Sequence, residues 1–119
     1  MTEEHKLTPP ADAKRVMRVA DLPQDRSPAR YEIRNLGEKP RLVTRDKRQR
    51  QILDLLIAGP VFCASPVRIS DTVHIHKREI GLQVETTMYP GDPATGAGAY
   101  GIYRLISRVR RLDEQEAAA

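Results

Sequence analysis

Apolar residues repeat at helical spacing in two segments of the chain. In the first segment, Ile52, Leu55 and Leu56 recur at positions i, i+3 and i+4, which places them on one face of a helix. Thr44 is a suitable N-cap before this segment, and the Gly-Pro pair at 59–60 is a typical helix end. The pattern therefore predicts a first helix between these two signals.

The second helical segment follows shortly afterwards. Four of its residues step by four, three and four positions and share one helix face: Ile69, Val73, His76 and Ile80. Ser65 is a suitable N-cap, Pro66 suits the first helical position, and Gly81 is a suitable C-terminal cap. These signals predict a second helix over residues 66–79.

Three other segments have the composition of strands. Residues 61–64 are apolar and short, so they form either a strand or the remnant of a further helix. Residues 82–89 alternate at their start, and residues 100–105 alternate again after the turn-rich stretch 90–99. The last two segments therefore predict a β-hairpin with a long tip.

The two ends of the chain lack this regularity. Residues 1–40 contain five of the nine prolines, and we expect a flexible arm in which only 11–22, at helical spacing, and 31–34, which alternates, order locally. Apolar residues at 105, 109 and 112 predict a short terminal helix. The expected organisation is an arm (1–40), one domain (41–112) and a disordered tail (113–119).

The predicted elements define a small core of aliphatic side chains, since the chain has no Trp and 4% aromatic residues. We expect eight residues to be buried together: Ile52, Leu55, Leu56, Ile69, Val73, Ile80, Val84 and Ile102. The predicted fold class is α+β.

The charge balance favours an anionic partner. Twenty Lys and Arg against sixteen Asp and Glu give a net charge of +4. No apolar run is long enough to span a membrane, and the N-terminal residues do not resemble a signal peptide. We expect a protein that does not bind membranes and that lies in the cytoplasm, associated with the nucleoid.

The order of these elements resembles the winged helix-turn-helix domains of bacterial and phage regulators. The resemblance rests on four motifs between residues 45 and 106: Gly59-Pro60-Val61, Ile69-Ser70-Asp71-Thr72-Val73, Lys77-Arg78-Glu79-Ile80-Gly81-Leu82, and the Tyr-x-x-Tyr-Arg-Leu ending at Leu105. It implies that the second helix lies in the major groove of double-stranded DNA and that the hairpin forms a wing beside the backbone. The function expected is transcriptional regulation. Only ten positions separate Gly59 from Ile69, which is too few for the family's usual positioning helix and its turn, so this helix is either truncated or replaced by residues 61–66.

The second helix has suitable chemistry on the side opposite its apolar face. Arg78 can pair with guanine, His74 can donate or accept, and Ile75 can meet a thymine methyl group. Asp71 can accept from cytosine or cap the helix, and Thr72 lies at the flank. We expect these five side chains to contact bases, although a solvated helix surface would look similar.

Basic residues around the first helix suit contacts with the DNA backbone, and a solvated helix face is an equally supported alternative. The expected phosphate contacts are Arg45, Lys47, Arg48, Arg50, Lys77 and Arg104, the last at the base of the wing. The wing tip has no Lys or Arg, so only its backbone or Thr95 can contribute there.

Other functions have weaker support in the sequence. His74 and His76 point in different directions on a helix and Cys63 is the only thiol, so we expect no metal, and no catalytic motif or cofactor-binding loop is present. We therefore expect no enzyme activity. The alternative is a protein-interaction adaptor that binds a protein partner, or a second copy of the chain as a homodimer, through residues 1–40 or 105–112.

Overall fold

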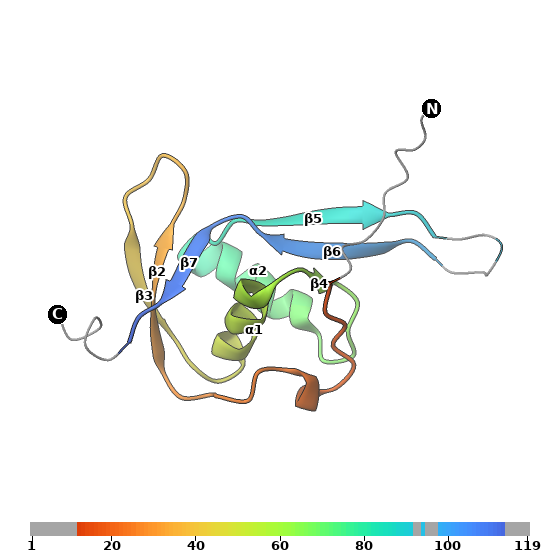
Figure 1. Ribbon diagram of the computed structural model, residues 1–119, viewed down its shortest axis with the longest axis horizontal. Helices are drawn as coiled ribbons and strands as arrows, with labels where there is room; N and C mark the ends of the chain where they lie inside the picture. The colour runs from red at the N-terminus through yellow and green to blue at the C-terminus, as the bar shows by residue number, and fades with distance from the viewer. Residues whose placement is uncertain (1–11, 92–93, 95–97, 114–119) are drawn as a thin grey trace.

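The computed structural model describes residues 12–91, 94 and 98–113, which form an α+β fold (Figure 1). The described residues contain two α-helices, one 3-10 turn and two antiparallel sheets of three strands each. The elements follow in the order η1 (Val19–Asp21), β2 (Ala29–Arg34), β3 (Arg41–Arg45), α1 (Lys47–Ala58), β4 (Val61–Phe62), α2 (Ile69–Ile80), β5 (Val84–Tyr89), β6 (Tyr100–Leu105) and β7 (Arg108–Arg111). The fold class predicted from the sequence is confirmed.

Three sequence predictions concern residues outside this description. They are the first eleven residues of the arm, the contact of the wing tip through Thr95, and the tail beyond Asp113.

The predicted hairpin is present and forms one of the two sheets. β5 pairs with β6 from Val84 opposite Leu105 to Tyr89 opposite Tyr100. β4 adds to the other edge of β6, which gives the strand order β4-β6-β5. The segment at 61–64 is therefore a strand at Val61–Phe62, and residues 63–68 contain no helix. No positioning helix stands between α1 and α2.

The other sheet corrects the expectation of a flexible arm. β2 is its central strand and pairs with β3 on one side and β7 on the other. Tyr31 and Ile33 of β2 are fully buried, so the alternation at 31–34 does mark a strand. The terminal helix predicted over 106–112 is wrong, because Arg108–Arg111 forms β7 and its Val109 lies opposite Ile33. The apolar stripe proposed for docking at 105, 109 and 112 is thus part of a sheet.

The segment before β2 also packs on the core instead of forming the helix expected over 11–22. Lys14 forms an isolated parallel bridge with Val61, and only Val19–Asp21 is helical, as a 3-10 turn. Val16 and Leu22 are buried with the rest of the core. The domain thus includes residues 12–40 and does not begin at residue 41.

Both helices exist, but α1 begins two residues later than predicted and α2 three residues later. Thr44 is in β3, and α1 starts after Asp46. Before α2, Ser65 closes a turn by accepting from the backbone N–H groups of Val67 and Arg68. Arg68 then adopts a left-handed conformation (φ 57°), so the helix begins at Ile69. The predicted ends at Gly59 and Gly81 are confirmed.

All eight side chains predicted for the core are buried. Sequence analysis omitted several others that are equally buried, chiefly from the first forty residues and from α1: Val16, Leu22, Tyr31, Ile33 and Leu53. None of the helices in the described residues is long and apolar enough to cross a membrane.

The two sheets join where β6 bends into β7. Ser107, at this bend, donates to Asn35 Oδ1 and accepts from the backbone N–H of Gln83 at 2.8 Å. The Asn35 amide in turn donates to the carbonyl of Gly81 at 3.0 Å. These buried bonds fix the end of α2 against the end of β2.

His76 is fully buried on the core face of α2 and is neutral in the folded protein. Its Nε2 donates to the carbonyl of Gln49 at 3.0 Å, while its Nδ1 has no partner among the described residues. Burial lowers the pKa of His76 to about 4; the bond to Gln49 opposes this shift and the charge of Arg45 adds to it. Protonation of His76 therefore shifts the folding equilibrium toward the unfolded chain, in which its pKa is higher.

We expect His76 to make the domain less stable in mild acid. Between pH 6.5 and 4 the unfolded chain binds a proton that the folded domain does not, so the free energy of unfolding falls as the pH falls, by up to about 1.4 kcal/mol per pH unit from this group. Urea unfolding at pH 7.5, 6 and 5 measures the slope. His76→Gln should reduce it, and an equal slope in the two proteins would contradict the assignment.

Candidate nucleic-acid interface

α2 presents an exposed basic face opposite the core. Because Ile69, Val73, His76 and Ile80 face inward, the helical turn of about 100° per residue directs His74, Lys77 and Arg78 to solvent. All three side chains are exposed. Within the described residues, none of the three has an ion pair or hydrogen bond to its side chain. They are available for a ligand.

The two acidic side chains of α2 are each paired with an arginine. Asp71 lies 3.0 Å from Arg68, an ion pair in which both side chains are largely exposed. Glu79 lies 3.1 Å from Arg45, whose side chain is only 10% exposed. The exposed face of the helix is therefore basic even though its sequence contains both signs. Asp71 remains exposed, as a contact with a base requires.

Two of the predicted base contacts are poorly placed. Thr72 is 9% exposed, because it lies beside the core positions Ile69 and His76 on the helix surface, so the prediction that it contacts a base is wrong. Ile75 is half-buried and presents only part of its side chain. Packing of its buried part against the protein therefore partly explains why an apolar residue stands at position 75.

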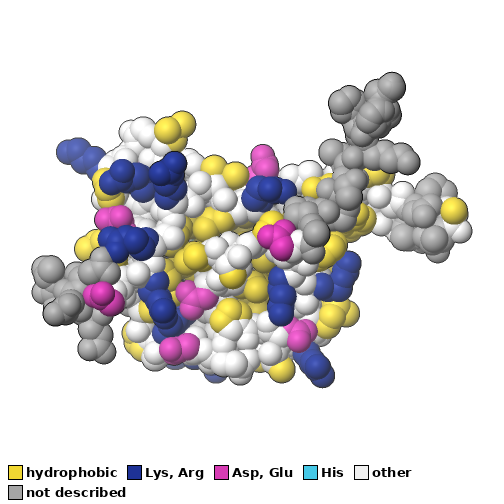
Figure 2. All heavy atoms as spheres, viewed as in Figure 1, with side chains coloured by type: hydrophobic (Ala, Val, Ile, Leu, Met, Phe, Trp, Pro, Cys, Tyr) yellow, Lys and Arg dark blue, Asp and Glu magenta, His cyan; other side chains and the backbone are white. Residues whose placement is uncertain are grey.

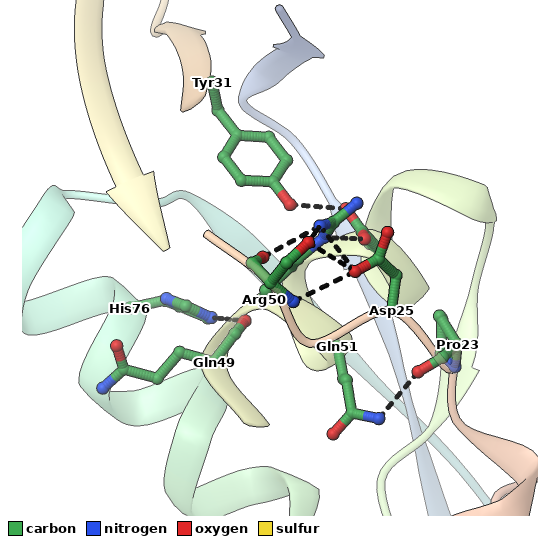
Figure 3. Close-up of polar contacts among 9 residues, drawn as sticks. Pro23, Asp25, Tyr31, Gln49, Arg50, Gln51 and His76 are labelled. Carbon is green, nitrogen blue, oxygen red and sulfur yellow. Dashed lines mark hydrogen bonds and ion pairs between the residues drawn. The ribbon is translucent and has the colours of Figure 1, made fainter. Parts of the chain in front are cut away.

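Arg50 is not available to DNA, which corrects its predicted role as a phosphate contact. Its side chain is 3% exposed and lies 3.1 Å from both Asp54 and Asp25 (Figure 3). It also donates to the backbone and hydroxyl oxygens of Ser27. Arg50 therefore holds the segment before β2 against α1.

Two further hydrogen bonds lie beside Arg50. Tyr31 of β2 donates to Asp54 of α1 at 2.7 Å. Gln51 of α1 donates to the carbonyl of Pro23 in the segment before β2.

The other basic residues expected on the first helix divide into buried and accessible ones. Arg45 lies in β3, where it donates to Gln49 and Glu79, so it too is wrongly predicted as a phosphate contact. Lys47 is exposed at the start of α1. Arg48 is half-buried and donates to Gln51 at 3.3 Å. Of this group, Lys47 has the least hindered approach to a phosphate.

The hairpin of β5 and β6 contributes one accessible basic side chain. Arg104 of β6 is exposed and lies opposite Glu85 of β5 in the hairpin register. Opposite charges at such a position attract each other across the strands. Arg104 therefore offers a weaker phosphate contact than an arginine with no acid beside it.

Sequence analysis missed a second basic surface, on the outer side of the β3-β2-β7 sheet. Figure 2 shows Lys and Arg side chains gathered at the end of the molecule where this sheet lies. Four exposed arginines on β2 and β7 alternate with inward-facing residues and are here named the arginine face: Arg30, Arg34, Arg108 and Arg110. Both strands show an alternation of inward-facing and charged residues that could have predicted them, in Ala29–Arg34 and Arg108–Arg111. They were missed because a charged segment near prolines has the same composition as a flexible one.

Comparison with known proteins identifies no relative. The chain matches no protein-family model, no curated protein and no solved structure. No group of three or more His, Cys, Asp or Glu side chains in the described residues is arranged to hold a metal ion.

Proposed function

We propose that this protein binds double-stranded DNA and places the exposed face of α2 in the major groove. The observation that carries the proposal is the set of exposed, unpaired side chains on α2, namely His74, Lys77 and Arg78. α2 has twelve residues and is therefore about 18 Å long. With its side chains a helix is about 10–12 Å across, and the major groove, about 12 Å wide, accepts it. Arg78 and His74 have the donor groups that read base edges.

The arrangement around α2 supports a winged-helix mode of docking with one departure. β4 before the helix and the hairpin after it form one sheet. In this proposal, β5 and β6 serve as the wing. α1 packs directly against α2, and a strand and turn replace the positioning helix. In this proposal Lys77, Lys47 and Arg104 contact phosphates, and the protein acts as a bacterial or phage transcriptional regulator.

Replacing Arg78 with Ala tests the groove assignment. We expect affinity for a preferred duplex to fall by about 1 to 3 kcal/mol and discrimination at one base pair to be lost, because a bidentate contact with guanine is removed. Fluorescence anisotropy with a preferred site, obtained by selection from random duplexes, and a scrambled duplex measures both effects.

Arg18→Ala is the matched control, since Arg18 is exposed, carries the same charge and lies before η1, away from α2 in the sequence. It should bind both duplexes nearly as the parent does. If Arg78→Ala keeps the parent's discrimination, α2 is not the reading helix. If the parent binds neither duplex, the adaptor alternative replaces DNA binding.

A further inference from the structure

The arginine face is built by the pairing of two strands that are far apart in the sequence. Alternation along β2 directs Tyr31 and Ile33 into the core and Arg34 to the opposite side. The register of β7 places Arg108 directly opposite Arg34 and directs Val109 inward. One side of the sheet is thus apolar and packed, whereas the other carries four arginines with Glu32 between them.

Arg34 and Arg108 are a like-charge pair directly opposite each other in the sheet. Glu32 lies 3.9 Å from Arg110, so the acid on this face is already engaged. In the described part of the chain, neither Arg34 nor Arg108 makes an ion pair or hydrogen bond through its side chain. Like charges directly opposite one another destabilise a sheet. An anion placed between the two arginines would reverse this effect.

The two arginines also share a concave site. Both line a hollow of about 400 Å³ where the loop after β2 meets the bend between β6 and β7. The amide side chain of Gln83 lines the same hollow, as does Glu38, whose carboxylate accepts from Asn35 at 3.4 Å. Two arginines against one carboxylate leave a net positive charge there.

We infer that the arginine face binds the sugar-phosphate backbone of duplex DNA, with Arg34 and Arg108 holding a phosphate group. The inference rests on the proposed function and adds a second contact surface to α2. The guanidinium group matches phosphate through two parallel hydrogen bonds, and all four basic residues of the face are arginine rather than lysine. The outward positions of this sheet carry no aromatic ring on which bases could stack, which favours the backbone over stacked bases. It therefore adds affinity without reading sequence.

The test is the salt dependence of binding by the double variant Arg34→Gln, Arg108→Gln in the full chain. The probe is a 30-base-pair duplex of random sequence, titrated at several KCl concentrations. Loss of the phosphate contact that the two arginines share should lower the slope of log K against log salt by about one and weaken binding on the order of 10-fold at 0.1 M salt. Because like-charge repulsion is also removed, the melting temperature should stay unchanged or rise, which separates the effect from misfolding.

Arg15→Gln, Arg18→Gln is the matched control, since it removes the same charge from exposed positions of a different segment. Equal loss of slope in both double variants would overturn the inference, because net charge alone would then explain binding. An unchanged slope in the first double variant overturns it while the parent's binding through α2 stands. A parent that does not bind the duplex overturns both proposals. Displacement of the duplex by poly-glutamate at equal charge would instead identify the occupant as an acidic peptide.

Discussion

A fragment of residues 41–112 is expected to lack a cooperative unfolding transition. The fragment loses β2, which is the central strand between β3 and β7, together with four buried side chains: Val16, Leu22, Tyr31 and Ile33. Each large side chain removed from a core costs about 2 to 5 kcal/mol, so the four together cost about 8 to 20 kcal/mol, which is as large as the roughly 5 to 15 kcal/mol that holds a typical small domain together. Circular dichroism during heating measures the transition, since the chain has no Trp to report by fluorescence.

Adding the missing segment in trans provides the control for this experiment. A synthetic peptide of residues 12–40 should restore a transition when mixed with the fragment, because it supplies β2 and the partners of Arg50 and Gln51. A fragment that melts cooperatively near the parent's temperature on its own would show that residues 12–40 are dispensable for folding.

Arg50→Ala is expected to destabilise the domain by about 2 to 4 kcal/mol, because it removes a buried side chain and leaves the partly buried carboxylate of Asp54 without its cation. The affected groups are Asp54, which is 20% exposed, and the oxygens of Ser27. Asp25 is 61% exposed and regains water at little cost. Urea unfolding followed by circular dichroism gives the change in free energy.

Arg48→Ala is the comparison for this variant, because it makes the same substitution on the same helix at a half-buried position. We expect it to cost no more than about 0.5 kcal/mol. A loss of similar size in the two variants would show that the bonds of Arg50 to the segment before β2 add nothing beyond helix packing.

The parts of the fold that were predictable are those determined by neighbours in the sequence. α1 and α2 carry their apolar stripe within twelve residues each, and β5 and β6 alternate on either side of a turn-rich stretch. The core face of α2, including His76, was predicted correctly for this reason. Helix starts were misplaced because Ser65 and Thr44 take part in a turn and a strand instead of capping a helix.

The parts that were not predictable depend on distant partners. Arg50 has the same local surroundings as Arg48, and only the approach of Asp25 and Ser27 distinguishes a buried arginine from a solvated one. β2 likewise forms a strand because it pairs with β7. Taken by itself, the β7 segment has the composition of a basic tail. A single sequence carries no signal that joins these two segments.

The pairing of β2 with β7 has a consequence for the growing polypeptide on the ribosome. Ile33 pairs with Val109, a residue synthesised 76 positions later (109 − 33 = 76), so one edge of β2 stays open until nearly all described elements have emerged. Contacts between such distant residues slow folding, and an open strand edge invites pairing with other chains. Nascent chains that stall before Arg108 are therefore expected to need chaperones more than the finished domain does.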